Sequence, residues 1–397
     1  MFDIKTTQGY FLHLIKSALR DEMPNEKPNE VDWRDVYEIA FIQNAANLAW
    51  FSIGKLSGKP EGELYAQWEL TYARAASKCM KQMMETDLLA QAFTEAGYDI
   101  MFLKGSEINS YYPSPDMRTM TDIDLLVRAD DREPVRELMK SLGYEVDLLD
   151  DGQVDAFKKY PVIYTEVHYD FSYEKHAYHD MFHIEWDKLV ESDVPHIYKM
   201  TFEDLYYFNI GHYAKNMHNR GMGIRAILDC YVLWNAASEE QKENILMRFK
   251  NTELEEFNEN LLKIMNIWFD DAMDDGSLQN VQRYLLETGT YGSIKKENTL
   301  YLIDNPENTQ SKSNLKFVFS KVFPSADELF DRFHIEKRRI ILLPYLWFKR
   351  IILLIFSSSA KKEKVKQDYQ MYKEISVDEV KYEIEIRKEF GLIKRNE

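Results

Sequence analysis

The pattern of apolar residues changes abruptly near Gly97. The stretch from Glu61 to Ala96 is rich in Ala, Leu, Met, Glu and Gln, which favour helices, and a glycine such as Gly97 commonly follows a helix end. From Tyr98 onward the apolar residues instead occur in short runs separated by turn-forming residues. Such runs are typical of strands, so this part of the chain is expected to form a sheet.

Four short apolar runs predict the strands of that sheet, and two helical segments are expected between them. The strands are Ile100–Leu103, Asp122–Val127, Tyr144–Leu149 and Pro161–Tyr169, and the helices are Glu107–Tyr111 and Arg132–Leu142. This order indicates the α+β class. We expect a small mixed-sheet core over residues 96–195, flanked by an N-terminal helical region over 1–95 and a C-terminal helical region over 196–397.

Charge and cysteine content exclude several classes of function. The 397 residues carry 50 Lys plus Arg and 67 Asp plus Glu, a net charge of −17. A surface this acidic repels polyphosphate, which argues against binding of duplex DNA and leaves RNA possible but not favoured. The two cysteines, Cys79 and Cys230, are too few for a disulfide framework or a thiolate zinc site.

The apolar segments predict no membrane span. The longest, Ile340 to Phe356, is interrupted by Pro344 and by the pair Lys349–Arg350, and it falls short of the roughly 18 clean residues of a spanning helix. The N-terminus lacks the pattern of a secretory signal. A cytoplasmic location is therefore expected.

Two carboxylates stand two residues apart in one predicted strand, at Asp122 and Asp124. Residues i and i+2 of a strand point to the same face, so both carboxylates are expected side by side. Their repulsion becomes attraction when a divalent cation lies between them, and Mg²⁺ prefers such oxygen ligands. The alternative is a solvated strand edge.

A later strand supplies a third carboxylate. Alternation places Tyr164, Glu166 and His168 on one face of the strand that follows Pro161. If that strand lies beside Asp122 and Asp124, three carboxylates converge and could hold two metal ions about 3.5–4 Å apart. A surface-facing glutamate on an edge strand is the alternative for Glu166.

The segment Lys104-Gly105-Ser106 lies where the first strand opens into a turn and then a helix. Glycine lets the backbone approach a ligand closely, and N–H groups at a helix start attract anions, so Gly105 and Ser106 would suit a triphosphate. Lys104 and Arg118 are candidate phosphate partners. Either could equally neutralise the acidic cluster.

These motifs together resemble a known family. The run LKGSEINSYYPSPDMRTMTDIDLLV, followed by TEVHYD, is similar to the bacterial uncharacterised nucleotidyltransferase family of the DNA polymerase beta-like superfamily. The resemblance extends to the helical stretches VDWRDVYEIAFIQNAANLAWF and GHYAKNMHNRGMGIRAILDCYVLW and to the later LPYLWFKR. It implies a polymerase-beta-like core and transfer of a nucleoside monophosphate (NMP) from a nucleoside triphosphate (NTP), with release of pyrophosphate.

The resemblance also implies roles for individual residues. Gly105 and Ser106 would bind the triphosphate, and Asp122 and Asp124 would hold Mg²⁺ or Mn²⁺. Glu166 would complete the catalytic site as a metal ligand and as the base for the acceptor. That acceptor would carry a hydroxyl group on a small molecule, a protein or an RNA. A nucleotide-binding regulatory module without turnover and a toxin-like RNA nucleotidyltransferase are the alternatives.

Further candidates lie near the strands and on two later helices. His168 could orient Glu166, contact the nucleotide or be a core histidine. Thr201 is a predicted N-cap for a helix that carries His212 and Lys215, and a second helix carries Arg225 and Asp229. The resemblance suggests that this pair of helices binds nucleotide or acceptor, whereas the spacing of Arg225 and Asp229 also suits a surface ion pair.

Two other groups have more ordinary interpretations. His176, His179 and His183 share a helical face, but no cysteine supports a zinc site there. A basic stretch near the C-terminus could meet an anionic acceptor or a membrane surface, although a solvated helix face is favoured. Its members are Lys337, Arg338, Arg339, Lys349, Arg350, Lys361, Lys362 and Lys364.

Overall fold

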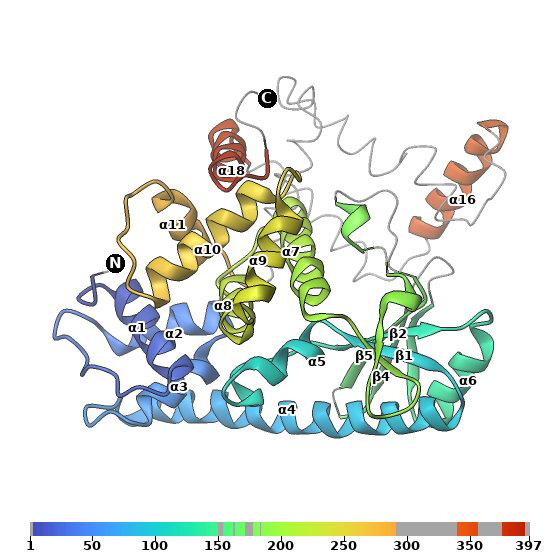
Figure 1. Ribbon diagram of the computed structural model, residues 1–397, viewed down its shortest axis with the longest axis horizontal. Coiled ribbons are helices and arrows are strands. Elements are labelled where there is room, and N and C mark those ends of the chain that lie inside the picture. The colour runs from blue at the N-terminus through green and yellow to red at the C-terminus, as the bar shows by residue number, and fades with distance from the viewer. Residues whose placement is uncertain are drawn as a thin grey trace.

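The fold belongs to the α+β class, in agreement with the sequence analysis. We describe a computed structural model, which covers residues 3–149, 154–161, 163–170, 178–182, 184–290, 340–355 and 375–393. A seven-stranded mixed sheet is surrounded by helices (Figure 1). Within the described residues, no helix has the length and apolarity needed to cross a membrane. His176, His183 and the predicted basic residues other than Lys349 and Arg350 lie outside these ranges.

Four N-terminal helices precede the sheet. They are α1 (Thr7–Leu19), α2 (Trp33–Ile42), α3 (Ala46–Ile53) and α4 (Gly62–Glu95). Side chains that accept backbone N–H bonds fix two of their starts, with Thr6 capping α1 and Asp32 capping α2. The long helix α4 ends as predicted, since Gly97 follows it with a φ of +75°.

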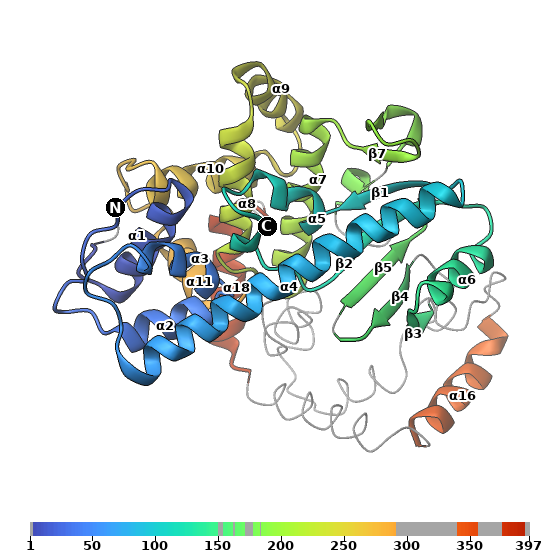
Figure 2. The same cartoon turned by 90° about the horizontal axis from the view of Figure 1, so that it is seen from below.

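Helix α4 connects the helical part of the molecule to the sheet. Its 34 residues span about 50 Å, and it runs below both parts of the molecule (Figure 1). Trp68 near its start is buried among the other helices, and Leu89 and Phe93 near its end pack on the sheet. Seen from below, α4 crosses the sheet next to β1 and β2 (Figure 2).

The sheet has the strand order β3-β4-β5-β2-β1-β7-β6. Its strands are β1 (Asp99–Leu103), β2 (Ile123–Arg128), β3 (Glu145–Leu149), β4 (Val154–Lys159), β5 (Ile163–His168), β6 (Val190–Glu191) and β7 (Ile197–Lys199). Strand β2 is antiparallel to β1 and parallel to β5. The β1–β7 pair is also parallel, and the remaining neighbours are antiparallel. The four predicted strands are thus confirmed as β1, β2, β3 and β5.

Three strands were not expected from the sequence. Strands β6 and β7 are short, and β4 contains Asp155, which interrupts its apolar alternation. Asp155 is fully buried because Arg136 binds both of its oxygens, at 2.7 and 3.0 Å. The partner comes from α6 (Glu133–Ser141), so this strand becomes recognisable only once the two elements are packed together.

Apolar side chains cover both faces of the central strands. On one face, Val135 and Met139 of α6 join the end of α4 over Ile123 and Leu125. On the other face, Leu126 packs with residues of the short η3 (His179–Phe182) and of α7. Short helical turns follow β1: α5 (Gly105–Ile108), η1 (Asn109–Tyr111) and η2 (Pro115–Met117).

The C-terminal part is helical, as predicted. The helices among its described residues are α7 (Phe202–Asn219), α8 (Arg225–Ala236), α9 (Glu239–Phe249), α10 (Glu255–Phe269), α11 (Gln279–Glu287), α16 (Leu343–Ile355) and α18 (Val377–Glu389), with η5 (Ile340–Leu342) as a short turn. A further short turn, η4 (Trp186–Lys188), precedes β6. Thr201 caps α7 by accepting from the Asp204 N–H, which confirms the predicted start. Phe11 of α1, Ile227 of α8 and Phe257 of α10 belong to one core, so helices from the N-terminal and C-terminal parts share it.

Candidate active site

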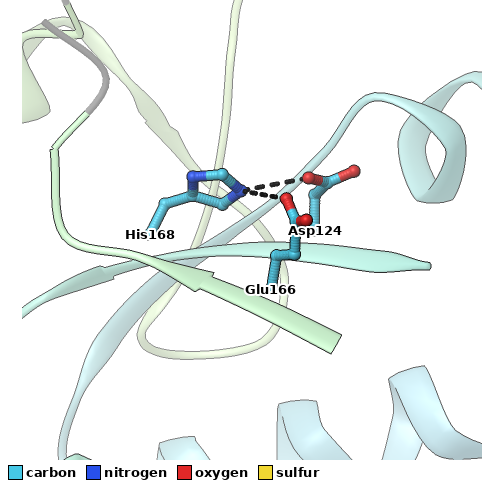
Figure 3. A group of neighbouring side chains, drawn as sticks. All are labelled: Asp124, Glu166 and His168. Atoms are coloured by element: carbon cyan, nitrogen blue, oxygen red, sulfur yellow. Dashed lines mark hydrogen bonds and ion pairs between the residues drawn. The ribbon is translucent and has the colours of Figure 1, made fainter. Parts of the chain in front are cut away.

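Two acidic side chains meet on adjacent parallel strands. In the register of β2 and β5, Asp124 lies directly opposite Glu166, and Leu126 lies opposite His168. Oxygen atoms of Asp124 and Glu166 and a ring nitrogen of His168 all lie within 4.8 Å of one another (Figure 3). Asp124 and His168 are buried, whereas Glu166 is half-exposed at the edge of the group.

Asp124 is the most strongly bound carboxylate of this group. Its Oδ1 atom lies 2.6 Å from Lys104 Nζ and 3.0 Å from His168 Nε2. Burial alone would raise the pKa of Asp124, but the Lys104 charge and the His168 hydrogen bond outweigh it and hold this pKa below its ordinary value. Asp124 therefore keeps its negative charge in the protein interior.

Asp122 lies immediately before β2, half-buried, and outside the group of mutually close atoms. Burial, together with the neighbouring Asp124 and Glu166 charges, raises the pKa of Asp122 to about 6, against the opposing effect of the Lys104 charge. The expected repulsion between these acids is thus present. The close group nevertheless differs from the expected trio, because it contains His168 where Asp122 was expected.

Lys104 reaches Asp124 from an unusual backbone conformation. Its φ of +50° and ψ of −117° belong to a region that favours glycine, at a cost of about 1–3 kcal/mol for other residues. The residue joins the end of β1 to α5, where its carbonyl accepts from the Ile108 N–H at 2.9 Å. The sharp turn directs the ammonium group to the carboxylates, so Lys104 neutralises the cluster in this conformation.

Gly105 is required by close packing within the chain. A Cβ atom at this position would lie 2.6 Å from Arg118 Nη1 and 2.8 Å from Met120 Sδ. Ser106, half-buried, follows at the start of α5, with its Oγ 3.9 Å from Met120 Sδ. The Gly-Ser step thus packs against the segment that precedes β2.

Arg118 and Asp229 bind each other in the interior. Arg118 Nε lies 2.7 Å from one oxygen of Asp229, and Arg118 Nη2 lies 2.9 Å from the other. The hydroxyls of Tyr112 and Tyr213 each donate to the same carboxylate at 2.7 Å. Burial would raise the pKa of Asp229, but the Arg118 guanidinium and these hydrogen bonds lower it.

This network corrects the idea of a surface ion pair between Arg225 and Asp229. Asp229 has no exposed surface, and it anchors α8 to the segment that leads into β2. Arg225 instead donates to Thr119 Oγ1 at 2.6 Å, in the same segment. The two helical residues therefore hold the approach to β2 in place.

Helix α7 brings two basic side chains to the acids. The pKa of His212 is lowered well below its ordinary value by burial and by the charges of Lys104 and Lys215, so its ring is neutral. Burial, together with the Lys104 charge, also lowers the pKa of Lys215 to about 8, against the attraction of Asp124 and Glu166. The sequence analysis named Lys215 as a residue of this candidate binding helix but gave it no role of its own. Its position three residues after His212, on the same helical face, was the signal available in the sequence.

The fold and the site together define the class: an α+β protein that carries acidic residues on neighbouring strands of a mixed sheet. The family model described as "Uncharacterised nucleotidyltransferase" matches residues 29–270, which is more than half of the chain. The chain belongs to this nucleotidyltransferase family. The match includes every residue of the candidate site.

Other comparisons add little. No curated protein matches the chain. Among solved structures, the crystal structure of an antigenic nucleotidyltransferase-like protein from Paracoccidioides brasiliensis is 16% identical to this chain. That match covers 42% of this chain and 87% of the other, with a TM-score of 0.28. The family assignment therefore depends on the family model.

Proposed function

We propose that this protein transfers an NMP from an NTP to a hydroxyl acceptor in a metal-dependent reaction. The observation that carries the proposal is the pair Asp124 and Glu166, opposite each other on parallel strands, with Lys104 bound to Asp124. Family membership supports the class of reaction. Neighbouring carboxylates in a partly buried site can bind divalent ions, and these ions in turn can bind a triphosphate.

The reaction exchanges one phosphorus–oxygen bond for another. The acceptor oxygen attacks the α-phosphorus, the bond from that phosphorus to the bridging oxygen breaks, and pyrophosphate leaves with the bond electrons. In this proposal Glu166, which lies half-exposed beside Asp124, takes the hydroxyl proton. Such a transfer asks the protein mainly for positioning and for stabilisation of charge.

The donor atoms fit a divalent cation. Asp122, Asp124 and Glu166 offer oxygen ligands, and the Lys104 ammonium already marks a position where positive charge is stable. We propose that two ions, Mg²⁺ or Mn²⁺, bind here. When bound, they would neutralise the triphosphate and the developing charge on the acceptor oxygen. The raised pKa of Asp122 supports this role, because a cation would offset both the burial and the repulsion by Asp124 and Glu166 that raise it.

The triphosphate is proposed to lie between α5 and α7. Lys104, Gly105 and Ser106 approach from the β1–α5 turn, and His212 and Lys215 approach from α7. Lys215 supplies positive charge, and neutral His212 can donate or accept a hydrogen bond. Arg118, Arg225 and Asp229 are proposed to act through position, since they fix the segment before β2.

A transfer assay with labelled nucleotides tests the proposal. Each of the four NTPs, labelled at the α-phosphate, is incubated with Mg²⁺ or Mn²⁺ and with small-molecule, protein or RNA acceptors, and pyrophosphate release is followed in parallel. We expect label on one acceptor class and loss of both signals in Asp124→Asn. Asp147→Asn, on the outer strand β3 and paired with Lys158, is the matched control that keeps activity.

The assay also separates the alternatives. NTP binding without pyrophosphate release for any acceptor would favour a regulatory nucleotide-binding module and overturn the proposal. Label on RNA alone, together with growth arrest on expression that Asp124→Asn relieves, would identify a toxin-like enzyme.

A further inference from the structure

We infer that His168 is a ligand of the same metal ion as Asp124 and Glu166, and that it makes this site prefer Mn²⁺ over Mg²⁺. The inference depends on the proposed function only in requiring a divalent ion at these acids. It replaces an all-carboxylate site by one with two carboxylates and one imidazole.

The positions of the three donor atoms support a shared ion. His168 Nε2 lies 3.0 Å from Asp124 Oδ1 and 3.5 Å from Glu166 Oε2. Adjacent ligands of an octahedral ion with bonds of about 2.1 Å lie about 3 Å apart. The nitrogen therefore already stands at ligand spacing from both carboxylates, and Figure 3 shows its ring directed at them.

The strand fixes this arrangement before any ion arrives. His168 and Glu166 are two residues apart on β5 and so point to the same face, and the parallel register places both next to Asp124. Only 2% of His168 is exposed, which leaves its ring little freedom to turn away. Residues held by a strand and by burial make a preorganised ligand set.

Ligand chemistry then decides which ion binds best. Mg²⁺ prefers oxygen ligands and keeps several waters, whereas imidazole suits transition metals. Mn²⁺ shares the preference of Mg²⁺ for oxygen ligands. As a transition ion, Mn²⁺ also takes an imidazole nitrogen more readily than Mg²⁺ does, and it can still carry a triphosphate. A mixed site should bind Mn²⁺ about tenfold more tightly than Mg²⁺, and an all-oxygen site should show a smaller difference.

The competing interpretation is that His168 only donates a hydrogen bond to Asp124. In that case the Nε2 atom carries the proton and cannot bind a metal, and the imidazole acts as a positioning group. Both interpretations place Nε2 close to Asp124 Oδ1, so a distance alone does not separate them. A spectroscopic signature of a nitrogen bound to the metal does.

The test is electron spin echo envelope modulation of Mn²⁺ added to the full-length protein. We expect a directly bound ¹⁴N signal that changes to the ¹⁵N pattern when histidine is ¹⁵N-labelled, and that is absent in His168→Asn. His196→Asn is the control, because His196 also contacts a carboxylate, Asp99 at 2.7 Å, but outside the site. Calorimetry should show about a tenfold loss of Mn²⁺ affinity in His168→Asn and little change for Mg²⁺.

Each outcome decides the inference. No nitrogen coupling in the wild type, coupling that survives His168→Asn, no binding of Mn²⁺, or equal losses for both ions would overturn it. If His168→Asn does not fold, the labelled wild type together with His168→Gln gives the same answer. A nitrogen-bound Mn²⁺ without transfer to any acceptor would support this inference while the proposed function fails, and transfer without nitrogen coupling would mean the reverse.

Discussion

Two buried carboxylates of this protein, Asp124 and Asp229, have very different surroundings. Arg118 and two tyrosine hydroxyls bind both oxygens of Asp229, and Asp229 has no exposed surface. Asp124 shares one oxygen between Lys104 and His168 and stands beside the half-exposed Glu166. A carboxylate with both oxygens bound by other residues holds a structure together, whereas one that stands beside a second, half-exposed acid is a candidate for chemistry.

The largest expected effect is on activity, and it distinguishes Asp124 from Asp229. Asp124→Asn should reduce nucleotide transfer roughly a thousandfold, because it removes a proposed metal ligand. Its free energy of unfolding should change by less than about 2 kcal/mol, since Lys104 still interacts with Asp122 and Glu166 and one of several repelling charges is lost. Pyrophosphate release and urea unfolding measure the two quantities. Activity of Asp124→Asn within tenfold of the wild type would contradict this difference between the two carboxylates.

The next effect concerns stability. Asp229→Asn should lower the free energy of unfolding by about 3–5 kcal/mol, because the buried Arg118 guanidinium loses its ionic partner. The double variant Arg118→Met/Asp229→Leu should lose less than the sum of the single losses. Glu137→Gln, which breaks the exposed pair with Lys140, is the control and should change stability by less than about 0.5 kcal/mol. A loss of that small size for Asp229→Asn would show that the network is dispensable.

A smaller effect links pH to nucleotide binding. Because the pKa of Lys215 is lowered to about 8, this side chain loses its positive charge as the pH rises through that value. Affinity for a non-hydrolysable NTP should therefore fall about three- to tenfold between pH 7 and pH 9. Lys215→Arg stays charged over this range and should give a flat profile. A wild-type profile equally flat in titration calorimetry would remove Lys215 from the binding site.

A further expected effect is a pH dependence of stability, which comes from Asp122. Its pKa of about 6 in the folded protein lies above the ordinary value near 4 of an unfolded chain. The folded state thus holds a proton that the unfolded state has lost between these values, so raising the pH from about 4 to 6 should cost about 2 kcal/mol of stability. Urea unfolding of wild type and Asp122→Asn gives this contribution as the difference between two curves. Parallel curves would show that neither burial nor the neighbouring acids raise the pKa of Asp122 in the folded protein.

The sequence was sufficient to predict those features that depend only on residues close together in the chain. The alternation of β5 placed Glu166 and His168 on one face, and the residue pattern located the ends of α4 and the start of α7. Strand β4 escaped prediction because Asp155 looks exposed until Arg136 is packed against it. The partner of Asp229 escaped for the same reason, since Arg118 is distant in the sequence.

By itself, the sequence determined most of the described helices and four of the seven strands, and it singled out Asp122, Asp124 and Glu166 as candidate metal ligands. Periodicity and chain reversal are local properties, so residue order is enough to reveal them. Only the tertiary structure decided that β5 lies parallel to β2, that His168 joins the acids, and that Lys104 and α7 supply the positive charge. These pairings bring together residues far apart in the chain, and burial and charge select them only when the whole fold has formed.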